Sequence, residues 1–177
     1  MDINQLKYPI GKFRAPYRIT PATRENYIND LERLPGQITE AVKGLTNNQL
    51  DTAYRPEGWT IRQVVHHIPD SHLNSYIRYK WALTEKQPLI KAYHEKEWAQ
   101  LPDALKGPVE MSLELLQDLH KRWVWLLRNL SQEDWSKCFI HPETGKQIPL
   151  DLNLSLYSWH GKHHLAHITS LKERKGW

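Results

Sequence analysis

A chain of 177 residues has the length of one ordinary domain, and we treat residues 1–177 as a single domain. The net charge is +4, but the Lys and Arg residues are scattered and form no basic face of the kind that nucleic-acid binding needs. No stretch approaches the roughly 18 apolar residues of a membrane span, and the N-terminus lacks the apolar core of a signal peptide. We therefore expect a soluble cytoplasmic protein that binds neither nucleic acid nor a membrane. The single cysteine, Cys138, excludes an internal disulfide.

The first helix is predicted after a non-periodic N-terminal segment. Residues 1–19 lack a hydrophobic period and predict an ordered arm or extended leader. Thr20 followed by proline is typical of a helix start, and apolar residues then recur every three or four positions to about residue 45. Pro35, followed by a glycine, is expected to kink or break this helix.

The second helix has a clearer start. Residues 46–59 are rich in polar and turn residues and predict a loop. Thr60 and Gln63 then have the spacing of a capping box, which opens a helix that reaches about residue 83. Pro69 lies inside this helix, where it removes one backbone hydrogen bond and is expected to bend the helix.

A long connection separates the second helix from the third. Residues 84–109 contain three prolines and a glycine, with one short helical turn expected around 95–101. The third helix is predicted over 109–130 from its inward-facing leucines. Long connections of this kind often have a function.

The last third of the chain predicts a hairpin and a final helix. The turn residues between 138 and 148 indicate a short hairpin. Asp151 or Asn153 is expected to cap the last helix, which Gly176 ends. Four long amphipathic helices with one long crossover predict an all-α fold, a four-helix bundle with a short hairpin before the last helix.

Histidine is the unusual residue in the composition, with ten in the chain. Four of them fall within 160–167. His160 and His164 are four positions apart, so on a helix their side chains share one face and could bind one metal ion. The same spacing relates His163 and His167, and spacing alone does not choose between the two pairs.

A third metal ligand would come from the second helix. His66, His67 and His72 compete for this role. His67 falls beside the apolar stripe, His66 falls toward the exposed side, and His72 lies close to the core face. The alternative is that these residues are ordinary histidines held by hydrogen bonds. We favour metal binding because burying so many imidazoles without partners costs desolvation energy.

Several strings of this sequence resemble one known family. Residues 58–67, 70–78 and 157–168, with Tyr8–Gly11 and Gly176–Trp177 at the ends, are similar to the YfiT branch of the DinB/YfiT-like family of metal-dependent hydrolases. The likeness covers essentially the whole chain. It implies a four-helix bundle with a single metal ion at one end of the core, and a homodimer.

The resemblance also implies the metal ligands. By position they are His67, His160 and His164, and they would hold one divalent ion. Imidazole ligands favour zinc or nickel as that ion. The sequence departs from the family at Pro69, where we expect alanine. That change puts the direction of the His67 side chain in question.

Three protein ligands would leave an open position on the ion, which is typical of catalytic rather than structural zinc. A metal-activated water that hydrolyses a small-molecule substrate is the first interpretation. Hydrolysis usually needs a general base, and the candidates are Asp70, His72 and His163. None of the three is marked out by the sequence, so the catalytic residues stay unassigned.

Two alternatives remain. The first is a metal-dependent thiol S-transferase, in which the ion binds a low-molecular-weight thiol such as bacillithiol and Arg62, Arg78 or Lys162 holds its carboxylates. Related branches of the family have this activity. The second is a non-catalytic module that the metal only stabilises.

Overall fold

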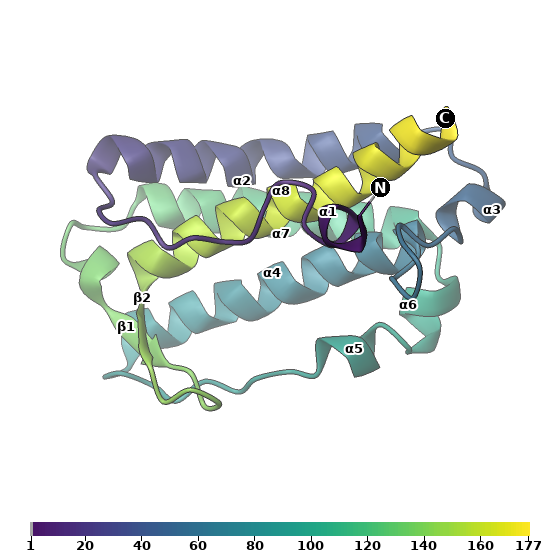
Figure 1. Ribbon diagram of the computed structural model, residues 1–177. Helices are drawn as coiled ribbons and strands as arrows, with labels where there is room; N and C mark the ends of the chain where they lie inside the picture. Colours follow the sequence, from purple (N-terminus) through teal and green to yellow (C-terminus); the bar gives the residue numbers. More distant parts are fainter. Residues whose placement is uncertain (1) are drawn as a thin grey trace.

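Four long helices form the body of the molecule, as the computed structural model of residues 2–177 shows (Figure 1). The helices form two pairs: α2 contacts α7 and α8, and α4 also contacts α7 and α8. The all-α four-helix bundle predicted from the sequence is confirmed. The four helices are α2 (Pro21–Val42), α4 (Ile61–Thr84), α7 (Val109–Arg128) and α8 (Leu150–Lys175).

The order of the helices explains the long crossover. In Figure 1, α4 and α7 run in the same direction, opposite to α2 and α8. Two consecutive parallel helices need a connection that returns along their whole length. Residues 85–108 provide it and carry α5 (Glu95–Trp98) and α6 (Pro102–Lys106), both of which contact α4. The helical turn expected near residue 95 is present, whereas α6 was not predicted.

The remaining elements are short. The strands β1 and β2 pair antiparallel, with Phe139 opposite Ile148, so the predicted hairpin is confirmed. The N-terminal segment is not extended throughout, because it begins with a five-residue helix. The short elements are α1 (Ile3–Lys7), α3 (Asn47–Leu50), η1 (Asp134–Ser136), β1 (Cys138–Ile140) and β2 (Gln147–Pro149).

The start of α4 is fixed as the sequence predicted. The Thr60 hydroxyl accepts a hydrogen bond from the Gln63 backbone N–H at 3.1 Å, and the Gln63 side-chain oxygen accepts from the Thr60 N–H at 2.9 Å. This capping box sets the helical register of the residues that follow. The helix continues through Pro69 without interruption.

Two expectations about helices need correction. Of the two effects expected at Pro35, a break is excluded, because the neighbours of Pro35 stay helical on both sides. Helix α8 begins at Leu150, after Pro149, and neither Asp151 nor Asn153 caps it. Both side chains have partners in the tertiary structure instead: Asp151 pairs with an arginine of α2, and Asn153 donates a hydrogen bond to a serine of α4.

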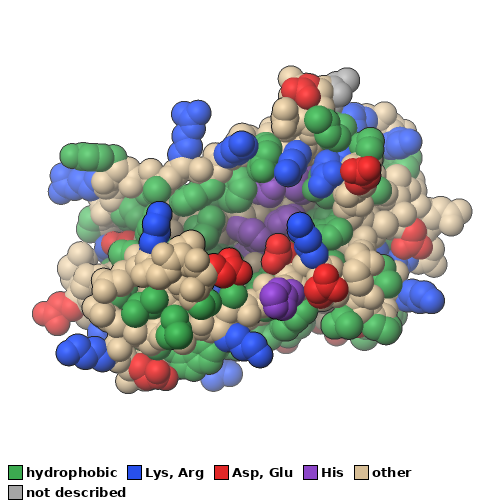
Figure 2. Space-filling view, turned by 60° about the horizontal axis from the view of Figure 1, so that its bottom comes forward, with side chains coloured by type: hydrophobic (Ala, Val, Ile, Leu, Met, Phe, Trp, Pro, Cys, Tyr) green, Lys and Arg blue, Asp and Glu red, His purple; other side chains and the backbone are tan. Residues whose placement is uncertain are grey.

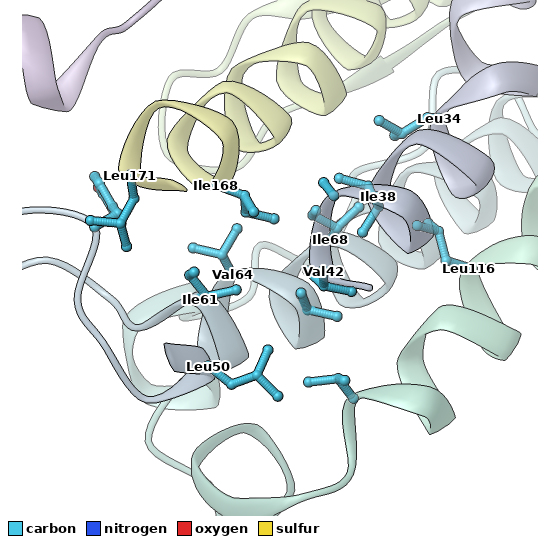
Figure 3. Close-up of a cluster of buried hydrophobic side chains, with 14 residues drawn as sticks. Leu34, Ile38, Val42, Leu50, Ile61, Val64, Ile68, Leu116, Ile168 and Leu171 are labelled. Carbon is cyan, nitrogen blue, oxygen red and sulfur yellow. The ribbon is translucent and has the colours of Figure 1, made fainter. Parts of the chain in front are cut away.

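The apolar core has two parts. One lies around the start of α4 and the end of α8 and is drawn in Figure 3, where Leu34, Ile68 and Ile168 come from three different helices. The other surrounds the fully buried Trp123 and Tyr79 nearer the hairpin. No helix in the described part of the chain has both the length and the apolarity to cross a membrane.

Candidate metal centre

Three histidines from two helices converge in the bundle. His67 lies two turns into α4, and His160 and His164 are one turn apart on α8. The Nε2 atoms of His67 and His160 are 3.3 Å apart. The His164 ring centroid is 4.8 Å from that of His67 and 4.5 Å from that of His160. One ring nitrogen from each residue lies within 4.8 Å of the other two.

This arrangement fits a transition-metal ion. Two nitrogens that bind zinc at its usual bond length and tetrahedral angle lie about 3.3 Å apart, which is the separation of the His67 and His160 Nε2 atoms. Desolvation lowers the pKa of His67 to about 4 and the pKa values of His160 and His164 well below their usual range. All three rings are therefore neutral at pH 7 and keep a free lone pair. The buried His164 Nδ1 has no hydrogen-bond partner within residues 2–177.

The competing pair on α8 lies on another side of the helix. The His167 ring stacks on Tyr54 at 3.9 Å, and its Nε2 is 3.1 Å from the backbone oxygen of Lys7. The His163 ring stacks on Trp159, with centroids 4.5 Å apart, and on Tyr8, with centroids 6.1 Å apart. These contacts tie the N-terminal segment to α8 (Figure 1) and keep both rings out of the three-histidine cluster.

His66 is not exposed, contrary to the sequence expectation. Its side chain is buried, with Nδ1 2.7 Å from the Ser112 hydroxyl and Nε2 3.2 Å from the Gly107 backbone oxygen. The crossover and the start of α7 cover this side of α4, which the periodicity of α4 alone does not reveal.

His72 lies behind the cluster rather than in it. Its Nε2 is 3.1 Å from the Nδ1 of His160, and its Nδ1 is 2.9 Å from the Nε2 of His120. His120, on α7, in turn bonds through Nδ1 to the backbone oxygen of Leu31 on α2. Desolvation lowers the pKa of His120 to about 4 and that of His72 well below its usual range.

The role of His120 was not predicted from the sequence. A signal was available, because this residue lies four positions after Leu116 and three before Trp123, on the apolar stripe of α7. All three side chains are buried. A histidine on such a stripe either has a polar partner inside the protein or carries a large desolvation cost.

A cavity of about 890 Å³ gives access to the cluster. In Figure 2, histidine side chains lie in a hollow near the middle of the displayed face, with basic and acidic side chains around it. Trp59 lies against the His67 ring at 4.6 Å. The lining combines aromatic rings, histidines and a few charged groups, among them Lys7, Tyr8, Tyr54, Arg55, Trp59, His67, Glu95, Lys96, His163, His164 and His167.

Comparison with known families gives a consistent result. Residues 30–168 match the model of the DinB superfamily, which is most of the chain. The chain belongs to the DinB superfamily. The resemblance to its YfiT branch is also confirmed: YfiT from Bacillus subtilis has 47% sequence identity and a TM-score of 0.95, over 98% of this chain and 99% of that one. That structure is reported as a probable metal-dependent hydrolase with an unusual four-helix bundle topology.

Curated relatives agree over the full length. A protein from Bacillus cereus (strain ATCC 10987) and one from Bacillus thuringiensis subsp. konkukian are each 55% identical to this DinB-superfamily chain, over 99% of it and all of the relative. A protein from Bacillus anthracis is 54% identical over the same share. All three carry the name "putative metal-dependent hydrolase".

The basic residues suggested for binding a thiol lie elsewhere in this DinB fold. The buried Arg62 forms an ion pair with the exposed Asp51 at 2.6 Å, and Lys162 pairs with Asp30 at 2.7 Å. Arg78 is buried near the Phe139 ring, 6.0 Å from its centroid. Arg62 and Lys162 thus have acidic partners, whereas the Arg78 Nε is buried without a hydrogen-bond partner among residues 2–177. None of the three lines the cavity.

The three candidates for a general base are also separated by the fold. Both ring nitrogens of His72 are engaged by other histidines. Asp70 lies outside the cavity lining, and desolvation together with nearby Asp103 raises its pKa to about 6. His163 lines the cavity, its buried Nδ1 has no partner among the described residues, and desolvation lowers its pKa to about 4.

Proposed function

We propose that this protein is a metal-dependent hydrolase of a small-molecule substrate, with one divalent ion held by His67, His160 and His164. The observation that carries the proposal is the convergence of three neutral imidazoles beside a cavity large enough for such a substrate. The activity named for its full-length relatives supports the same conclusion. Imidazole ligands favour zinc or nickel as the ion.

The ion, when bound to three ligands, would supply a Lewis acid and a water of lowered pKa. The protein supplies the rest. His67, His160 and His164 keep their lone pairs at neutral pH because desolvation disfavours their protonation. His163 is neutral for the same reason, and we assign it the role of taking a proton within the cavity.

The cavity walls indicate what kind of substrate would fit. Trp59 and Tyr54 present apolar rings that can hold an uncharged group and exclude water from it. Lys7, Arg55 and Lys96 add positive charge to the lining, and two glutamates, Glu57 and Glu95, offset part of it. A substrate with an apolar body and one anionic group matches this lining best.

We further propose that residues 1–177 act as one domain, in the cytoplasm, and as a homodimer. The cytoplasm is proposed because a lone, unpaired cysteine is typical of reducing compartments. The homodimer rests on the resemblance to the YfiT branch.

Hydrolysis is tested on tag-free protein that has been stripped of metal and reloaded with zinc or nickel. A panel of aryl esters and amides carrying a carboxylate is assayed with and without added thiols. We expect turnover that needs the metal, does not need a thiol, and is lost in His164→Ala. Turnover that requires bacillithiol or another small thiol would replace this proposal with a thiol S-transferase. Metal binding that raises the melting temperature without turnover would favour a non-catalytic module.

A further inference from the structure

A row of three imidazoles runs from the metal centre to the far side of the bundle. It connects His160 on α8 to His72 on α4 at 3.1 Å, and His72 to His120 on α7 at 2.9 Å. It ends at the backbone oxygen of Leu31 on α2, which bonds the Nδ1 of His120. The row therefore links all four long helices. It also separates the two apolar clusters of the core.

The carbonyl at the end of the row fixes the direction of every hydrogen bond in it. A carbonyl oxygen only accepts, so the Nδ1 of His120 must carry the hydrogen. A neutral imidazole has one N–H, which leaves the Nε2 of His120 as an acceptor for the Nδ1–H of His72. By the same step, the Nε2 of His72 accepts from the Nδ1–H of His160. The Nε2 of His160, which faces His67, is then left with a free lone pair.

We propose that His72 and His120 are positioning residues that lock the tautomer and the ring plane of His160. The His160 Nε2 is then unprotonated and ready to bind the ion before the ion arrives. This inference rests on the proposed role of His160 as a ligand. Metal-bound histidines usually donate their second N–H to a carboxylate, a carbonyl or water. Here the acceptor is the neutral ring of His72, and the tautomer of His72 is set by His120.

Pro35 explains why the Leu31 carbonyl is available. In a regular helix this carbonyl would accept from the N–H four residues later, but Pro35 has no N–H. The proline that leaves α2 intact thus exposes one backbone acceptor to α7, and His120 uses it. The ring of His120 also stacks on that of His72, with centroids 4.9 Å apart, and Trp123 meets both rings edge-on. These contacts hold the ring planes in place.

The tautomers are read directly in the metal-free protein by long-range proton–nitrogen correlation NMR at pH 7.5, with single-histidine variants used to assign the signals. We expect His160, His72 and His120 each to carry the proton on Nδ1. A proton on the Nε2 of His160 in the wild-type protein would overturn the proposal. This measurement needs neither metal nor substrate, so it stands apart from the test of hydrolysis.

Zinc affinity provides the second test, by competition with a chromophoric chelator. His120→Phe keeps a stacked ring but removes both nitrogens, and we expect zinc affinity to fall by about 10- to 100-fold. His120→Gln keeps one donor and one acceptor and should recover most of the loss. His66→Phe is the matched control, because the His66 side chain is also buried and lies near a carbonyl, yet its two ring nitrogens face Ser112 and Gly107 and not the ligand rings.

The outcomes separate the explanations. Equal zinc affinity in His120→Phe and His66→Phe would reduce His120 to a structural residue and overturn the proposal. If His120→Phe does not fold, the tautomers of the metal-free wild-type protein still decide it. Wild-type protein that binds no zinc or nickel would instead refute the proposed function.

Discussion

At the residue scale, His164 and His163 are adjacent on α8, but only His164 is a proposed metal ligand. Successive helical residues differ by about 100° in direction, so His163 and His164 point to different sides. His164 faces His67 and His160, whereas His163 faces the rings of Trp159 and Tyr8. Both line the cavity, and only the geometry across helices distinguishes them.

This difference predicts opposite results for two adjacent alanine substitutions. His164→Ala should lower zinc affinity by roughly 100-fold or more, because it removes one of three ligands. His163→Ala should leave the metal content of the purified protein unchanged and lower only turnover. Elemental analysis of tag-free protein measures both. Loss of metal in His163→Ala with retention in His164→Ala would assign the site to the other histidine pair.

The candidate site could be predicted from the sequence only in part. The spacing of four on the last helix and the resemblance to a known family selected His67, His160 and His164, and the structure brings these together. Spacing failed for His66, whose burial depends on the crossover that covers it. For His120 the apolar stripe of α7 signals burial, but it does not reveal that α2 supplies the carbonyl that His120 needs. A helical period reports which side of a helix is apolar, not what lies opposite it.

At the element scale, α2 and α4 could be predicted from an apolar stripe and a capped start, at Thr20 and Thr60, and α7 from its apolar stripe alone. The wrong expectations about helix breaks and caps concern residues whose conformation depends on tertiary contacts. Pro35 does not break α2, whose apolar side is buried on both sides of it. Asp151 does not cap α8 because it pairs with Arg24 at 2.7 Å. The four- and five-residue helices α3 and α6 are too short to give a period.

Two helical glycines predict opposite effects on stability. A Cβ at Gly161 of α8 would lie 2.5 Å from a methyl carbon of the buried Leu34, so this glycine allows α2 to approach α8. A Cβ at Gly36 of α2 would meet nothing within 4 Å. Overpacking should make Gly161→Ala about 1–3 kcal/mol less stable. Gly36→Ala should be up to about 1 kcal/mol more stable, because alanine favours the helix.

Urea unfolding of the two variants and the wild-type protein, each free of metal, measures the difference. The gain in helix propensity is the same in both variants, so their difference isolates the contact between α2 and α8. A stabilising effect of Gly161→Ala would mean that Leu34 moves aside freely and that the two helices are less tightly packed than described.

At the scale of the whole molecule, the bundle buries a layer of neutral histidines between two apolar clusters. Such a layer lowers the stability of the fold little while the rings are neutral and hydrogen-bonded to one another. It becomes costly when protons are added, because burial opposes the charged form. The same layer that prepares the metal centre therefore makes the fold sensitive to acid.

The sign of this effect follows from the pKa values. His67, His120 and His163 have pKa values of about 4 in the folded protein and His167 about 3, against 6.5 as the ordinary value. Between pH 6.5 and 4 the unfolded chain binds more protons than the folded one, so the free energy of unfolding falls as the pH falls. Each group contributes about 1.4 kcal/mol per pH unit in this window. Below pH 4 the contribution of most of these groups levels off.

We therefore expect metal-free protein to lose its fold about one to three units below pH 6.5, since a domain of this kind has only about 5–15 kcal/mol of stability. Urea unfolding followed by tryptophan fluorescence at steps of 0.5 pH unit measures the slope. His120→Phe removes one of the groups and should reduce the slope by about 1.4 kcal/mol per pH unit. Zinc-loaded protein should stay folded to a lower pH, because the ion binds only the folded state. A free energy of unfolding that stays constant from pH 7 to 4.5 would show that these histidines are not buried in neutral form.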